Sequence, residues 1–159
     1  MLDEQRFGAD ETPCLSVRHL SKRFGAGCSH CLEPGAQLNR NVCPRCGTVH
    51  AVRDVSLEVF PGEIVGVVGE SGSGKSTFMK CLFFDEEATE GEVRALPYDG
   101  GAANLLDLSP QQRRAVRNTV FGMVYQNPYL GLRMDFSSLS NIAEQMIAAG
   151  SRSVGVMRG

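Results

Sequence analysis

One short stretch constrains this chain more than any other: residues 69–76, which read Gly-Glu-Ser-Gly-Ser-Gly-Lys-Ser. This is the phosphate-binding loop pattern, in which a glycine and four residues precede Gly-Lys-Ser or Gly-Lys-Thr. The apolar run 64–68 before it predicts a buried strand, and residues 77–84 after it predict a helix. A strand, a glycine loop and a helix in this order form a site for a nucleoside triphosphate. A chance match on a flexible glycine turn is the alternative, and the two flanks disfavour it.

The loop residues have individual roles in this interpretation. Gly72 and Gly74 should adopt positive φ and let the backbone approach the phosphates without a Cβ clash. Lys75 is expected to reach the β- and γ-phosphates as a catalytic residue, and the Ser76 hydroxyl to bind Mg²⁺. The predicted nucleotide-binding residues of this segment are Gly69, Glu70, Ser71, Gly72, Ser73, Gly74, Lys75, Ser76 and Thr77.

Length and composition fit one ordinary globular domain, because 159 residues can bury a sizeable core and only 21% are charged. The net charge of −2 gives no basic surface, so no nucleic-acid partner is expected. No apolar run approaches the roughly 18 residues that a membrane helix needs. Residues 1–13 are acidic and lack the apolar core of a secretory signal, so we expect a flexible N-terminus and a cytoplasmic protein.

Four of the six cysteines form two Cys-x-x-Cys pairs, Cys28 with Cys31 and Cys43 with Cys46. Two such knuckles favour one structural Zn²⁺, because each short loop offers two thiolates to a tetrahedral ion. Two disulfides are an alternative that a reducing cytosol disfavours, and a redox Cys-x-x-Cys would not come as a matched pair. Four thiolates already fill a closed site, so His30 and His50 are left out and are expected at the surface.

The rest of the pattern alternates strands and helices, as in an α/β fold. Expected strands lie at residues 15–20, 55–59 and 121–125, with a turn at 90–93 that leads into another strand. One helix should begin at Ser109-Pro110 and another should span 139–149, ending at Gly150. The cysteine segment, residues 27–50, falls between the first two strands. A zinc ion there would explain how a short insert with few apolar residues becomes ordered.

These motifs together resemble the N-terminal half of an ATP-binding cassette (ABC) ATPase. The resemblance covers about residues 14–158, apart from the cysteine insert. Segment 65–77 is similar to the branch of this family that serves dipeptide and nickel importers. The segments 121–128, 131–133 and 141–144 look closest to the ATP-binding subunit of the bacterial phosphonate carbon–phosphorus lyase system. The expected fold is therefore an incomplete P-loop NTPase of the ABC type, with a small zinc-ribbon-like insert.

The resemblance implies further site residues. Phe24 lies where the family places an aromatic ring that stacks on adenine, and ordinary core packing is its alternative role. Gln126 matches the family's Q-loop glutamine, a catalytic residue whose amide carbonyl can bind Mg²⁺ and sense the γ-phosphate. Residues 127–150 would open the helical subdomain that docks a partner. ATP and Mg²⁺ are the implied cofactors.

Several family motifs are absent after Gln126. The sequence has no Leu-Ser-Gly-Gly-Gln-like signature, no apolar strand that ends in Asp-Glu, and no switch histidine. Phosphoryl transfer needs an oriented nucleophile as well as held phosphates. We therefore expect residues 14–159 to form a truncated ATP-binding domain that does not hydrolyse ATP alone. An uncovered sheet edge predicts poor stability or aggregation.

Three functional hypotheses follow. The first is the nucleotide-binding half of an ATPase that works with the carbon–phosphorus lyase core complex. The second is the same half-domain from a dipeptide- or nickel-type importer, docked on an ABC permease at the inner face of the membrane. The third is a zinc-ribbon interaction protein with a vestigial nucleotide fold. A dimer with a complete ABC subunit is a further expected assembly.

Overall fold

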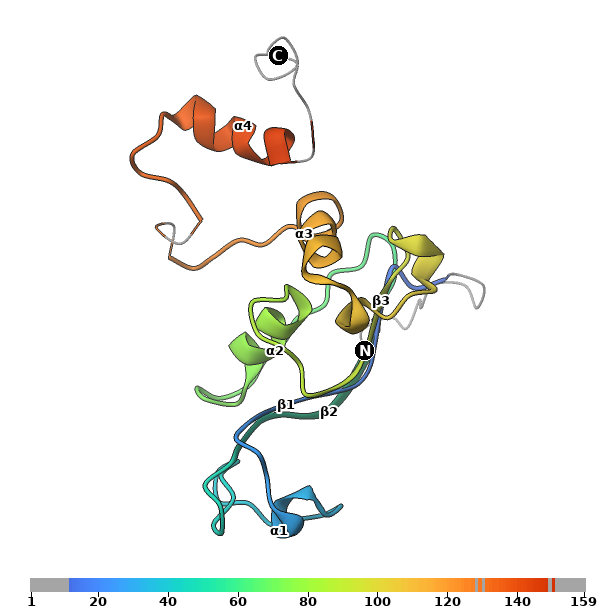
Figure 1. The fold of residues 1–159 in the computed structure, drawn as a ribbon, viewed down its shortest axis with the longest axis vertical. Coiled ribbons are helices and arrows are strands. Elements are labelled where there is room, and N and C mark those ends of the chain that lie inside the picture. The colour runs from blue at the N-terminus through green and yellow to red at the C-terminus, as the bar shows by residue number, and fades with distance from the viewer. Residues whose placement is uncertain (1–11, 128, 130, 149, 151–159) are drawn as a thin grey trace, which may run out of the picture. The chain divides into compact units, whose positions relative to one another are not determined.

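The computed structural model describes residues 12–127, 129, 131–148 and 150 (Figure 1). The chain divides into two compact units, residues 1–108 and 109–159, and each is described here by itself. Most of the predicted flexible segment 1–13 lies outside the described residues, as does the tail 151–159. No helix within the described ranges has the length and apolarity to cross a membrane.

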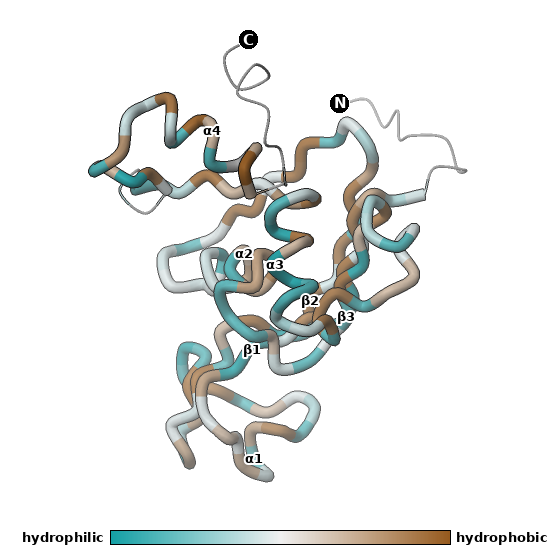
Figure 2. The backbone as a smooth tube through the Cα atoms, turned by 45° about the horizontal axis from the view of Figure 1, so that its top comes forward, coloured by the Kyte–Doolittle hydropathy of each residue, from teal (hydrophilic) through white to brown (hydrophobic). Residues whose placement is uncertain are grey.

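A three-stranded antiparallel sheet forms the centre of the first unit, with the order β2-β1-β3 (Figure 1). Its strands are β1 (Leu15–Phe24), β2 (Val49–Val59) and β3 (Glu90–Ala95). β1 and β2 extend beyond the predicted segments, because their pairing continues from Leu15 opposite Val59 to Phe24 opposite Val49. The turn predicted at 90–93 is wrong, because these residues pair with β1 as part of β3. Val17, Leu20 and Val93 are almost fully buried and form the core of this sheet. Hydrophobic positions recur along its strands (Figure 2).

The cysteine segment connects β1 to β2, as predicted. It contains a short helix, α1 (Ser29–Leu32), which the sequence did not indicate. Two isolated β-bridges follow, one between Asn39 and Val42 and one between Val42 and Val49 at the start of β2. The insert therefore ends in backbone pairing with the start of β2.

The predicted helix after the glycine loop is present as α2 (Lys75–Leu82). It buries Phe78 and Cys81. A 3₁₀ turn, η1 (Asp99–Gly101), follows β3, and a second 3₁₀ turn, η2 (Leu105–Asp107), comes after it. Leu105 is completely buried, so η2 contributes a side chain to the core.

The predicted buried strand at residues 64–68 is wrong. These residues form no strand, and Ile64 and Val68 are 97% and 93% exposed. A strand needs neighbouring backbone groups that accept and donate its hydrogen bonds. No segment within the described part of the chain pairs with residues 64–68. The apolar pattern alone was therefore insufficient to form a strand.

The second unit contains two helices, α3 (Pro110–Thr119) and α4 (Ser138–Ala148), close to their predicted positions. Ser109 and Gln112 form a reciprocal capping box at the start of α3, which confirms the predicted serine cap and proline start. The predicted strand at 121–125 is wrong, because these residues adopt no regular structure and Val124 is 96% exposed. Gly150 has a φ of 89°, the left-handed conformation expected after a helix end.

Candidate functional site

The glycine loop has the backbone conformation that its sequence predicts. Gly72 and Gly74 have φ values of 80° and 92°, and α2 begins directly afterwards at Lys75. A side chain would be strained at either position. A Cβ on Gly74 would also overlap the carbonyl oxygen of Ala51 in β2. The glycine pattern thus lets the loop curve tightly and lie against the sheet.

Lys75 lies within the curve of its own loop. Its ammonium donates hydrogen bonds to the carbonyl oxygens of Gly69 and Glu70, at 2.8 and 2.6 Å. It also donates to the Ser73 hydroxyl at 3.3 Å. A positive charge therefore lies where the loop N–H groups and the start of α2 favour an anion. The predicted contact of Lys75 with the β- and γ-phosphates remains a prediction.

Phe24 lies at the end of β1 beside the same loop. Its side chain is 43% exposed, so the alternative of ordinary core packing is wrong. The ammonium of Lys22 lies 4.6 Å from the centre of the ring. Phe24 lines a pocket of about 300 Å³ together with the loop residues Gly72 and Lys75. This position is open to a planar base, and stacking on adenine remains a prediction.

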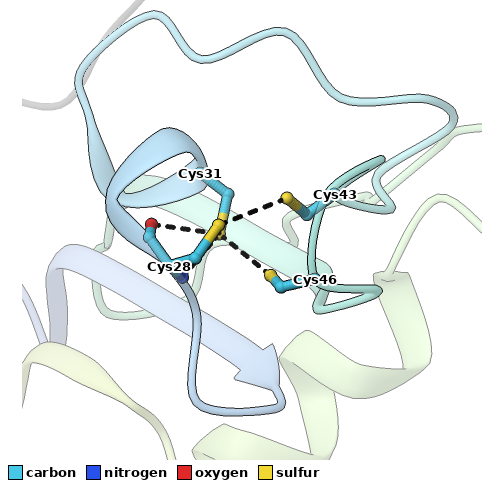
Figure 3. Close-up of side chains that lie close together, drawn as sticks. All are labelled: Cys28, Cys31, Cys43 and Cys46. Atoms are coloured by element: carbon cyan, nitrogen blue, oxygen red, sulfur yellow. Dashed lines mark hydrogen bonds between the residues drawn. The ribbon is translucent and has the colours of Figure 1, made fainter.

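The four paired cysteines converge on one point (Figure 3). All four Sγ atoms lie within 4.8 Å of one another, and the Cys31–Cys46 and Cys28–Cys43 separations are 3.7 and 3.8 Å. Ligands about 2.3 Å from a tetrahedral zinc ion would be about 3.8 Å apart. A disulfide would need about 2.05 Å, and all four thiols are free. The geometry thus matches one closed metal site and argues against the disulfide alternative.

The thiols of this cluster differ in acidity. Hydrogen bonds from the Thr48 hydroxyl and backbone lower the pKa of Cys46 to about 6. A backbone hydrogen bond with Cys28 lowers the pKa of Cys31, but burial and the neighbouring thiols outweigh it and raise the pKa to about 11. One thiolate, the form that binds metal, is therefore favoured at neutral pH within this cluster of thiols.

Sequence reasoning missed the role of Thr48. This threonine is 3% exposed, and its hydroxyl accepts a hydrogen bond from the Gly27 backbone at 3.1 Å. It joins both sides of the insert, since its hydroxyl also lies 3.2 Å from the Cys46 sulfur. The available sequence signal for this role was the position of Thr48, two residues after Cys46.

The surface position expected for His50 is wrong, because this histidine is 8% exposed. Burial lowers its pKa, and Arg53 and Arg23 add to the effect. Neither His50 nor His30 belongs to the four-cysteine cluster.

The comparisons with known proteins identify the family. The sequence matches the ABC transporter family over residues 52–156. The chain belongs to this family. Phe24 and the cysteine insert precede the matched segment, whereas the glycine loop and Gln126 lie within it.

Individual relatives agree with this assignment. The cassette is 39% identical over 105 residues to the phosphonates utilization ATP-binding protein PhnK of Escherichia coli (strain K12), covering 66% of this chain and 40% of PhnK. It is 37% identical over 129 residues to the glutathione import ATP-binding protein GsiA of Shigella dysenteriae serotype 1, covering 81% of this chain and 18% of GsiA. The cassette thus spans less than half the length of these relatives.

A solved structure supports the fold. The chain matches the ATP-binding cassette MJ0796, a dimer bound to ADP and phosphate, with a TM-score of 0.65 and 25% identity. The match covers 91% of this chain and 52% of the MJ0796 chain. The fold is therefore that of an ABC nucleotide-binding cassette, with a small antiparallel sheet formed here and the cysteine segment inserted between β1 and β2.

Gln126 belongs to the second unit, where it is exposed and follows residues without regular structure. The first unit contains the glycine loop, Phe24 and the cysteine cluster. The structure thus brings Phe24 and the loop to one pocket. The predicted role of Gln126 towards Mg²⁺ remains a prediction.

Proposed function

We propose that the cassette binds Mg·ATP through residues 69–77, as the N-terminal part of an ABC-type ATPase. The observation that carries the proposal is the loop itself, in which Gly72 and Gly74 adopt positive φ and Lys75 lies within the curve. These features leave space for phosphate oxygens at the backbone, because no Cβ projects from either glycine. The donor set of N–H groups, ammonium and hydroxyl suits a phosphate chain with its Mg²⁺.

Four side chains complete the proposed site. Ser76 binds Mg²⁺ through its hydroxyl, and Lys75 contacts the β- and γ-phosphates. Phe24 stacks on the adenine, and its exposure beside the loop supports this role. Gln126 is the proposed further Mg²⁺ ligand. Mg²⁺ itself supplies charge neutralisation between the phosphates when it is bound.

The site holds phosphates but does not orient a nucleophile. The sequence after Gln126 offers no Asp-Glu pair at the end of an apolar strand and no switch histidine. Orientation of the attacking water contributes much of the rate in phosphoryl transfer. We therefore propose that the 159-residue chain binds ATP without hydrolysing it.

The proposed biological setting is the phosphonate carbon–phosphorus lyase system, with the lyase core complex as partner in the cytoplasm. The 39% identity with PhnK supports this setting. An importer ATPase docked on a permease is the second candidate, and it is supported by the 37% identity with the glutathione import protein GsiA. The MJ0796 dimer supports pairing with a complete ABC subunit. Co-purification of lyase subunits or of a permease with the tagged chain separates the two settings.

Replacement of one lysine tests the proposed nucleotide site. We expect Lys75→Ala to weaken Mg·ATP binding by about tenfold or more, because it removes a charge-assisted contact with the phosphates. Lys80→Ala is the matched control, since Lys80 is an exposed lysine in the same helix outside the loop. Isothermal titration of each variant with Mg·ATP measures the effect. Equal affinities for both variants would contradict the proposal.

We also propose that Cys28, Cys31, Cys43 and Cys46 hold one structural Zn²⁺. The convergence of four Sγ atoms within 4.8 Å supports this site. The ion would fix the insert between β1 and β2, because the segment has few apolar residues of its own. Metal analysis should find one zinc per chain in the purified protein and none in Cys31→Ser.

The Mg·ATP titration and the zinc analysis together test the third hypothesis, a zinc-ribbon interaction protein with a vestigial nucleotide fold. That protein would retain zinc and a partner but would show no saturable Mg·ATP binding. Retained zinc together with nucleotide binding that depends on Lys75 favours the cassette ATPase.

A further inference from the structure

The pocket beside the glycine loop is lined partly by residues that lie outside the segment matching the ABC family. Arg40 and Asn41 of the cysteine insert line the same pocket of about 300 Å³ as Phe24 and Lys75. The family match begins only at residue 52. The insert therefore reaches the proposed nucleotide site as well as forming the cysteine cluster.

A tight hairpin turn presents Arg40 to this pocket. Asn39 and Val42 exchange two backbone hydrogen bonds, each 2.9 Å long. The two residues between them, Arg40 and Asn41, have φ values of 46° and 69°. Positive φ at both central positions is the arrangement of a type I′ turn. Asparagine tolerates this conformation, whereas arginine adopts it at an energetic cost, and such strain concentrates at binding sites.

The turn is fixed to the sheet next to the loop. The His50 backbone N–H donates a 2.7 Å hydrogen bond to the Asn41 carbonyl. The next residue, Ala51, is the one whose carbonyl lies against Gly74. A short path of backbone contacts thus joins the turn, β2 and the glycine loop. Arg40 is held at a defined place relative to Lys75.

The charge of the pocket favours an anion. Lys75 and Arg40 are its two charged residues, and no carboxylate lines it within the described part of the chain. The Arg40 side chain is exposed and forms no salt bridge with any residue that the structure describes. A guanidinium free of carboxylates can bind phosphate oxygens through two parallel N–H bonds.

We infer that Arg40 binds the phosphate chain of the nucleotide, so that the cysteine insert is a functional part of the nucleotide pocket. This inference rests on the proposed function of the glycine loop. It assigns the insert a role beyond stability, because the four cysteines fix the segment that carries Arg40. Loss of the metal should then weaken nucleotide binding even though residues 69–77 are unchanged.

Mg·ATP titration of variants of the whole chain tests the inference. Arg40→Ala should weaken binding by about tenfold, the size of one charge-assisted hydrogen-bond pair, and Arg40→Lys by less. Arg45→Ala is the matched control, since Arg45 is an exposed arginine of the same insert that does not line the pocket. It should bind as tightly as the wild type. Circular dichroism and zinc content show whether each variant keeps its fold.

The outcomes separate this inference from the proposed function. Weaker binding in both Arg40→Ala and Lys75→Ala, with Arg45→Ala unchanged, supports both. Unchanged binding in Arg40→Ala together with a loss in Lys75→Ala overturns the role of Arg40 alone. Unchanged binding in Lys75→Ala overturns the nucleotide site itself, and the inference with it. Should Arg40→Ala lose its zinc or its fold, Arg40→Gln replaces it, because glutamine keeps the length and polarity but removes the charge.

Discussion

Two neighbouring regions of the first unit differ in how far their sequence determines their structure. β1 and β2 pair from end to end, with register shifts in the middle, and the pairing continues into the cysteine insert. Residues 64–68 are more apolar than either strand but form no strand and remain exposed. The difference is the availability of a partner, because β1 and β2 satisfy each other's backbone groups. Residues 64–68 find no such partner among the described residues.

The insert shows how strongly local constraints can order a polar segment. Its cysteines converge, Thr48 joins its two sides, and its turn is bonded to β2. The largest expected effect therefore follows loss of the proposed zinc ion. Structural zinc contributes on the order of 10 kcal/mol to the folding of zinc-finger peptides, so Cys31→Ser should unfold the insert. Hydrogen exchange at the Cys43 and Gly47 amides, which are bonded within the insert, measures this loss.

Cys14→Ser is the control for that experiment. Cys14 lies outside the cluster and donates a 3.1 Å hydrogen bond to the Val59 carbonyl, which a serine can also form. Its exchange pattern should match that of the wild type. Protection of the insert amides in Cys31→Ser would show that the segment is ordered without its four-cysteine site.

A pair of alanine substitutions compares the sheet with the segment before the loop. Leu20 is completely buried, so Leu20→Ala should lower the free energy of unfolding by about 2–5 kcal/mol. Ile64 is 97% exposed, and Ile64→Ala should change the free energy of unfolding by less than about 0.5 kcal/mol. Urea denaturation of both variants gives the values. An equal cost at the two positions would mean that residues 64–68 are packed in solution.

The two loop glycines form a second pair. Gly74→Ala should cost about 2–3 kcal/mol, because the new Cβ adds a clash with the Ala51 carbonyl to the strain of positive φ. Gly72 also has positive φ, but a Cβ at this position would meet no atom within 4 Å, so Gly72→Ala should cost about 1–2 kcal/mol. The thermal unfolding midpoints of the two variants give the order of these two costs. The reverse order would contradict the close contact between the loop and β2.

The sequence predicted those features that depend on local chemistry. Glycines placed for positive φ, the Ser109 cap with Pro110, and two matched cysteine knuckles each determine their own surroundings. The strands predicted at 64–68 and 121–125 are wrong, because a strand depends on distant partners that apolar periodicity does not reveal. Arg40 was missed for a related reason, since its place in the pocket depends on a hairpin turn bonded to β2.

The most direct test of the account follows binding and hydrolysis in one sample. The 159-residue chain is titrated with Mg·ATP while phosphate release is recorded, with Lys75→Ala in parallel. We expect saturable binding that depends on Lys75, and phosphate release no faster than in Lys75→Ala. The account is contradicted by an absence of saturable binding, or by turnover in the wild type that Lys75→Ala abolishes.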